Sequence, residues 1–213
     1  MTKEEVRRLL EGRQYEGLLQ AAGDSREMIE YLFSFLNTRD GLLRWRAIEG
    51  LGHVAARLSK HNPDAGRDII QELLQCVDEA DDSNWSVPEA VGEIVRNRPD
   101  LFAGFVPTLV SLYADERLRR GVIWAMGRIG KRQPQLIASG MTVLIKALEE
   151  PDPEIRGFAA WSLGEIAAQE AASALGALRS DHETVTIYEA GKLWQRTVGA
   201  VALDALANIR ARA

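Results

Sequence analysis

The chain has 213 residues, of which 46% are hydrophobic and 27% charged, and its formal net charge is -5. This composition excludes the disordered class and predicts one soluble globular domain over residues 1–213. The acidic balance gives no general attraction to nucleic acid or to an anionic membrane, and the single cysteine, Cys76, excludes an intrachain disulfide or a Cys-based zinc site.

The chain opens with a charged segment, and no stretch reaches the ~18 apolar residues that a membrane span requires. We therefore expect neither secretion nor membrane insertion. A reducing, cytoplasmic location agrees best with the lone cysteine. Residues 1–25 are assigned to an N-terminal cap that precedes a series of repeats.

From residue 26 onward, one short pattern recurs: an apolar residue, a small residue, a polar residue and a β-branched apolar residue. Apolar side chains stand five before, one before and two after each small residue, so they form one helical stripe. The residue two before is also small, as close packing between helices requires. The small residues that mark the pattern, at spacings of 40, 35, 37 and 43, are Gly52, Gly92, Gly127, Gly164 and Ala207.

Each of these helices is preceded by a further helical segment, so every repeat is predicted to be a pair of helices. Pro63, Pro99 and Pro134 stand where first helices should begin. Asp152 before Pro153 predicts a capped start of a second helix, and Ser86 with Glu89 three residues later predicts a capping box. The expected first helices cover residues 28–36, 69–77, 101–113, 136–148 and 172–178.

Aspartate twelve before the small residue and arginine eight before it recur three times, as Asp40 with Arg44, Asp115 with Arg119, and Asp152 with Arg156. Their regular spacing predicts a structural charge ladder across the turns. The pattern Asp-x-x-x-Arg, followed by an apolar-Gly-x-Ile ending, resembles the HEAT repeat, particularly the short variety named after phycobilisome lyases. The resemblance covers about residues 26–213, and residues 152–167 match best.

The resemblance implies an all-α fold, a right-handed α-solenoid of about five HEAT-like helical pairs. Repeats one to four and the first helix of the fifth are expected in residues 26–180, and the last helix in 196–213. Residues 181–195 depart from the repeat. There, two alternating segments flank Glu189-Ala190-Gly191, which predicts a small β-hairpin that either caps the last repeat or binds a partner.

The resemblance also implies that the inner face of the second helices binds a partner. On each second helix we define the Trp stripe as the positions seven before, three before and one after the small residue, opposite the apolar stripe. Four of the five tryptophans fall on these positions, which the helical period predicts to be exposed. Our hypothesis is a binding groove lined by Trp45, Trp85, Glu89, Glu93, Arg120, Trp124, Arg128, Trp161 and Glu165.

An alternative interpretation has the tryptophans wedged between repeats, filling space beside the small residues. Trp85, just before Ser86, could also act as a hydrophobic staple. The histidines, His53, His61 and His182, are scattered without metal-ligand spacing, and the simplest phosphate-binding and hydrolase motifs are absent from the sequence. We therefore predict no catalytic residue, metal or cofactor.

The sequence thus predicts a non-catalytic scaffold that recognises a protein partner of basic or mixed charge. Two alternatives stay open. HEAT-like alkylpurine DNA glycosylases also use concave-face tryptophans beside an acidic residue, and Asn84-Trp85 with Trp124 is faintly similar, although the many carboxylates oppose DNA binding. The name of the lyase variety suggests a tetrapyrrole or another flat ligand between tryptophans, for which no residue supplies the chemistry.

Overall fold

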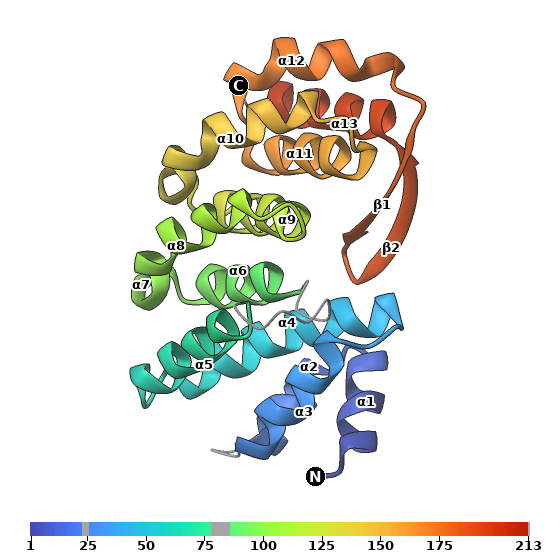
Figure 1. The fold of residues 1–213 in the computed structure, drawn as a ribbon. Coiled ribbons are helices and arrows are strands. Elements are labelled where there is room, and N and C mark those ends of the chain that lie inside the picture. Colours follow the sequence, from blue (N-terminus) through green and yellow to red (C-terminus); the bar gives the residue numbers. More distant parts are fainter. Residues whose placement is uncertain (23–25, 78–85, 213) are drawn as a thin grey trace. The chain divides into compact units, whose positions relative to one another are not determined.

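The structure is a computed structural model that describes residues 1–22, 26–77 and 86–212. The chain divides into two compact units, Met1–Phe105 and Val106–Ala213 (Figure 1). The boundary falls inside the first helix of the third predicted pair. Each unit is described by itself below, and the single repeat domain over 1–213 stays a prediction.

The first unit contains two of the predicted helical pairs, α3 with α4 and α5 with α6. The second helices of these pairs, α4 and α6, pack against each other, and α1 and α2 pack on α4 in the place of the expected N-terminal cap. Its helices are α1 (Lys3–Glu11), α2 (Tyr15–Ala22), α3 (Arg26–Leu36), α4 (Gly41–Leu58), α5 (Pro63–Gln75), α6 (Val87–Asn97) and α7 (Pro99–Phe102), with a 3-10 turn at Ala103–Phe105.

The second unit stacks three second helices in the order α9, α11, α13 (Figure 1). Its first helices are short and are preceded or followed by 3-10 turns at Leu112–Ala114, Pro134–Gly140, Ala147–Glu149, Gln169–Ala171 and Leu178–Ser180. Its elements are α8 (Val106–Ser111), α9 (Arg119–Gly130), α10 (Met141–Lys146), α11 (Pro153–Ile166), α12 (Ala172–Ala177), β1 (Thr184–Glu189), β2 (Lys192–Thr197) and α13 (Val198–Ala211).

The helix starts follow the predicted turn chemistry with one exception. α5 and α7 begin at Pro63 and Pro99, and the Asp152 carboxylate accepts a hydrogen bond from the Glu154 backbone N–H at the start of α11. The predicted capping box at Ser86 is wrong. Ser86 precedes α6, but its hydroxyl donates to the Leu36 carbonyl at 3.2 Å, because the free carbonyl at the end of α3 lies within reach.

Close helix packing rests on the small residues, as predicted. A Cβ on Gly127 would lie 2.5 Å from Ser162 Oγ, and one on Gly164 would lie 2.7 Å from Cα and Cβ of Ala205. The backbones of α9, α11 and α13 therefore approach each other where the repeat places its glycine and its second small residue. The Ser162 hydroxyl also donates to the Ile123 carbonyl at 2.8 Å, which links α11 to α9.

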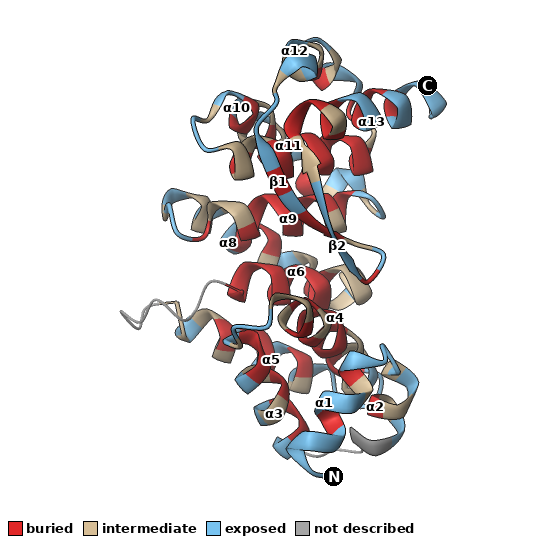
Figure 2. Ribbon diagram, turned by 90° about the vertical axis from the view of Figure 1, so that its right-hand side faces the viewer, coloured by how far each residue is buried: buried red, intermediate tan, exposed pale blue. Residues whose placement is uncertain are grey.

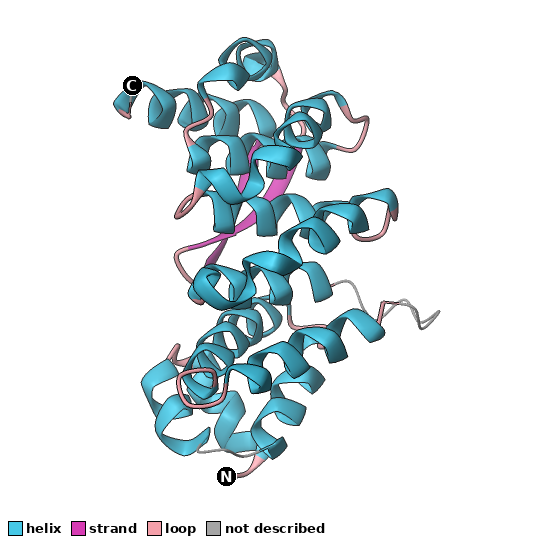
Figure 3. Ribbon diagram, turned by 90° about the vertical axis from the view of Figure 1, so that its left-hand side faces the viewer, coloured by secondary structure: helices cyan, strands magenta, loops and turns pink. Residues whose placement is uncertain are grey.

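The predicted hairpin is present, in residues 184–197 where the sequence predicted 181–195. β1 and β2 are antiparallel, with Glu189 opposite Lys192, and form the sheet of the described residues (Figure 3). Ala190 at φ 51° and Gly191 at φ 82° connect them. Two successive residues with positive φ define a two-residue type I′ turn, which fits the twist of paired strands.

The all-helical class with an added hairpin is thus confirmed. In the part of the chain that the structure describes, no helix has the length and apolar character needed to cross a membrane.

One testable consequence concerns the end of α11. Ala167 stops this helix at φ 60° and ψ 46°, a left-handed conformation in which the Cβ of an L-residue is strained. Glycine removes that strain, so Ala167→Gly should raise the free energy of unfolding by about 0.5–1 kcal/mol, measured by urea denaturation. Ala177, exposed and helical at φ -68°, is the matched control, because Ala177→Gly should lower it by a similar amount. Shifts of the same sign would contradict this account.

Candidate functional site

The Trp stripe is more buried than its helical period predicts. Trp45, Trp124 and Trp161 are only 4%, 0% and 7% exposed, and Glu49, Glu89, Glu93 and Glu165 are also buried. The prediction that these side chains face solvent is therefore wrong. Only Arg120 and Arg128 among the described site candidates are half-buried. Trp85 and Asn84 lie outside the described residues.

In the second unit, stripe residues from two helices come together. The indole of Trp124 on α9 stacks on that of Trp161 on α11, with ring centroids 6.1 Å apart and planes 7° apart. The guanidinium of Arg128 lies 5.2 Å from the Trp124 ring centroid, within the range of a cation–π contact. The two tryptophans therefore fill space between stacked repeats, as the packing interpretation expects, and hold Arg128 beside them.

The hairpin covers part of the same face of α11. A Cβ on Gly157, another stripe position, would meet the Val185 side chain of β1 at 2.6 Å, so the missing side chain admits the strand. At the far end of β1, Glu189 accepts a hydrogen bond from the Trp161 indole N–H at 3.4 Å. β1 alternates between exposed and buried residues, whereas the residues of β2 are exposed or intermediate (Figure 2). The hairpin is thus part of the candidate site.

A pocket of about 50 Å³ lies among α11, the hairpin and α13. Several of its lining residues stand at Trp-stripe positions, two from α11 and two from α13, so the stripe does line a concavity in this unit. β1 and β2 add one charged side chain each. The polar and aromatic residues of the lining are Trp161, Glu165, Glu189, Arg196, Asp204 and Asn208.

Most charges around this pocket are paired. Lys131 Nζ lies 2.6 Å from Glu165 Oε2, and Arg196 lies 2.7 Å from the Asp204 carboxylate. At the other end of α9, Arg120 pairs with Glu154 at 3.0 Å and lies 6.0 Å from the Phe158 ring centroid. Each pair has at least one partly exposed partner that water can screen, so these pairs position side chains and add little stability.

The first unit holds a second polar cluster on its stripe, around Glu49 of α4. Tyr15 donates its hydroxyl to Glu49 at 2.6 Å, and Arg13 donates at 3.1 Å. The ring of His53 stacks on Tyr15 with centroids 4.9 Å apart. Burial, helped by the Glu49 carboxylate, raises the pKa of Tyr15, and burial lowers the pKa of His53. Tyr15 therefore stays a neutral donor to the carboxylate at neutral pH.

The neighbouring helix α6 contributes two buried carboxylates, Glu89 and Glu93. Arg96, one turn further along α6, donates to Glu93 at 3.1 Å, and the Asn97 amide donates to the Glu93 carbonyl at 2.8 Å. Packing against α4 at Gly52 brings Glu93 within van der Waals distance of that helix. Of the predicted site residues in the first unit, Glu93 thus takes part in a hydrogen-bonded polar contact beside α4.

The Asp/Arg repeats do form structural contacts. Asp40 and Asp152 accept from the backbone N–H groups that start α4 and α11. Arg156 pairs with Asp181 at 2.8 Å, at the turn into the next repeat, and donates to the Glu150 and Pro151 carbonyls. Asp115 pairs with Arg117 at 2.7 Å, and Arg119 lies 3.8 Å from Glu150. These residues thus have structural roles at helix starts and turns, while the regular Asp/Arg ladder stays a prediction.

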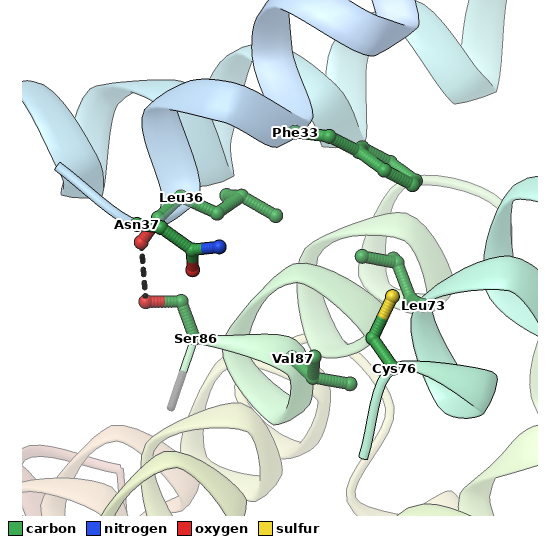
Figure 4. A pocket seen from close by; sticks show the side chains of 7 residues that line it. All are labelled: Phe33, Leu36, Asn37, Leu73, Cys76, Ser86 and Val87. Carbon is green, nitrogen blue, oxygen red and sulfur yellow. Dashed lines mark hydrogen bonds between the residues drawn. The ribbon is translucent and has the colours of Figure 1, made fainter. Parts of the chain in front are cut away.

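Two further pockets lie in the first unit. One has a volume of about 60 Å³ (Figure 4). Phe33 and Leu36 of α3 line one side of it, and Leu73 of α5 and Cys76, which follows α5, line another. The Ser86 hydroxyl lies at its edge. The other, of about 420 Å³, lies beside Leu58, His61 and Ile69. Both border chain outside the described residues, so neither is assigned a role.

Repeat reasoning missed the partners that come from outside the repeats. Arg13 and Tyr15 belong to the N-terminal cap, and Glu189 and Arg196 to the hairpin. A repeat pattern holds no signal for their positions, because equivalent residues do not exist in the other pairs. Among the described residues, no group of His, Cys, Asp and Glu could hold a metal ion.

Comparison with known proteins places this architecture in a class. Residues 106–193 match the family of HEAT repeats. Over 165 residues, the chain is 27% identical to an uncharacterized protein of Archaeoglobus fulgidus, covering 76% of this chain and 86% of the relative. An archaeal HEAT-like repeats protein from Thermococcus onnurineus NA1 has a similar solved structure, with 17% identity over 99% of this chain and 81% of that one and a TM-score of 0.46.

The family match lies within the second unit, and the stacked helical pairs agree with the HEAT-like repeat fold that the sequence predicts. Folds of this class generally mediate protein interactions.

Proposed function

We propose that the chain is a non-catalytic scaffold that binds a protein partner at the Trp-stripe face of its second unit. The observation that carries the proposal is the pocket among α11, β1, β2 and α13, which is lined by residues that the stripe and the hairpin contribute together. Stacked repeats present equivalent positions in rows, so such a face is continuous across neighbouring helices.

The buried tryptophans act as supports for this face. The Trp124–Trp161 stack is almost closed to solvent, so it cannot supply the contact area itself. It holds in place the half-exposed polar groups around it, among them Arg128 on α9, while Asp204 on α13 is largely exposed. A partner then meets alternating charges, and these favour a segment of mixed charge.

Charge reversal at the accessible residues tests this proposal without opening the core. The tagged full chain, with Arg128→Glu and Asp204→Lys combined, is expressed in the cells that make it, crosslinked and isolated. We expect at least a tenfold lower recovery of the proteins that crosslink to the wild type, because two favourable charge contacts become repulsive. Quantitative mass spectrometry of the crosslinked products measures the recovery.

The matched control is the same pair of charge reversals on the opposite side of a repeat, Lys146→Glu with Glu149→Lys. These exposed residues stand on α10 and the turn after it, which belong to a first helix. The control should recover the wild-type set of proteins. Equal recovery by both double variants, each with wild-type thermal unfolding, would contradict a partner site on the stripe.

A further inference from the structure

From the chemistry of the pocket in the second unit, and resting on the proposed function, we infer that it receives the ammonium or guanidinium group of a basic side chain of the protein partner. The lining brings three carboxylates from three separate elements, Glu165 of α11, Glu189 of β1 and Asp204 of α13. The hairpin lies against α11 and α13, so carboxylates from three elements line one pocket.

The charges inside the pocket are not balanced. Asp204 has Arg196 as its partner, and Glu165 has Lys131. Glu189 differs. Lys192 stands opposite it in the hairpin, but the Lys192 ammonium lies 5.8 Å from the Trp194 ring centroid, and within the described residues the hydrogen-bond partner of the Glu189 carboxylate is the neutral indole N–H of Trp161 at 3.4 Å. A half-buried carboxylate that meets only a neutral donor gains most from a cation, since charge-assisted hydrogen bonds are the stronger kind. The site therefore has room for one more positive charge.

The size of the pocket limits the ligand. A volume of about 50 Å³ admits the end of one side chain, whereas sites for whole small molecules span about 300–1,000 Å³. The Trp161 ring forms part of the wall, and its orientation is fixed by the stack on Trp124. An aromatic wall beside carboxylates suits an ammonium or guanidinium group, which is attracted to both.

The surroundings favour a side chain on a protein segment over a free cation. Trp194 on β2 is 47% exposed and Leu203 on α13 is 50% exposed. Along β2, Trp194 shares a face with Arg196, which lines the pocket, whereas Leu203, next to Asp204, points to another side of α13. Trp194 therefore offers apolar area to the residues that flank a basic side chain, which a small free cation would leave unused.

The test uses butylammonium as the probe and the indole N–H signal of Trp161 as the reporter. In 15N-labelled full chain, with this signal assigned through Trp161→Phe, butylammonium should produce a saturable shift, and n-butanol, its neutral analogue, should not. Glu189→Gln keeps an oxygen acceptor for the indole N–H but removes the charge. We expect it to weaken butylammonium binding at least fivefold. Glu183→Gln, the same change at an exposed residue before β1, should leave binding within twofold of wild type.

The source of the cation is tested in the crosslinking experiment. Glu189→Gln should lower partner recovery at least fivefold, and Glu183→Gln should not. If butylammonium gives no saturable shift while Arg128→Glu with Asp204→Lys still abolishes partner recovery, the cation site is wrong and the scaffold proposal stands. If butylammonium binds but Glu189→Gln leaves partner recovery unchanged, the pocket takes a free cation and the inferred side chain is wrong.

Discussion

Replacement of Trp124 by alanine is expected to lower the free energy of unfolding of the second unit by about 3–5 kcal/mol. The side chain is fully buried, stacks on Trp161 and lies under the Arg128 guanidinium. Its removal leaves a cavity between α9 and α11, where the backbone cannot close because Gly127 and Ser162 already hold the helices in contact. Urea unfolding followed by circular dichroism measures the change.

Trp194→Ala is the control for this variant. The same atoms are removed, but Trp194 stands on the exposed strand β2 and contacts Lys192 as a cation–π pair, with 47% of its surface open. Its loss should change the free energy of unfolding by no more than about 0.5 kcal/mol. The packing interpretation of the stripe fails if the two variants are equally stable, since Trp124 would then be as dispensable as a surface residue.

The sequence could predict the stacked helices because their cause is local. Apolar residues at helical spacing define one buried face, and a glycine at each marked position allows the helices to touch. Gly127 against Ser162 and Gly164 against Ala205 are the contacts that the repeat pattern implies. Pro63 and Asp152 likewise act on their own helices, so their predicted positions at helix starts are correct.

The exposure of the Trp stripe could not be predicted in this way. Helical period gives the direction of a side chain but not what lies in that direction. Trp161 is covered partly by Trp124 of the preceding repeat and partly by the hairpin, and the hairpin has no equivalent in other repeats. The alternating residues and the glycine turn do predict the hairpin. Its packing on α11 depends on the contact between Gly157 and Val185, which the alternating pattern does not predict.

The same limit explains why only some of the pocket-lining residues could be predicted from the sequence. Asp204 and Asn208 are stripe positions, so their presence on one face with Trp161 and Glu165 follows from the repeat. Glu189 and Arg196 reach the pocket only because β1 and β2 pair in the observed register. The repeat residues of this candidate site can therefore be predicted from the sequence, but the hairpin residues cannot. One of these hairpin residues is Glu189, whose carboxylate has no ion-pair partner among the described residues and accepts a hydrogen bond from Trp161.

Gly164 supplies the second large expected effect. Gly164→Ala places a methyl group 2.7 Å from Cα and Cβ of Ala205, so backbone, not a flexible side chain, must move. Overpacking of this kind costs about 1–3 kcal/mol, which exceeds the gain of up to ~1 kcal/mol from placing alanine in a helix. We expect the second unit to lose about 1–2 kcal/mol of stability in urea unfolding, because α11 and α13 are forced apart.

Gly176→Ala shows whether that loss comes from contact or from glycine itself. Gly176 also lies inside a helix, α12, but a Cβ there meets no atom within 4 Å. This variant should therefore gain about 0.5–1 kcal/mol from reduced backbone entropy in the unfolded chain. Opposite signs at the two glycines would tie the repeat's small residue to the distance between α11 and α13. A gain at both would mean that these helices can separate without cost, and the pocket that depends on their spacing would lose its structural basis.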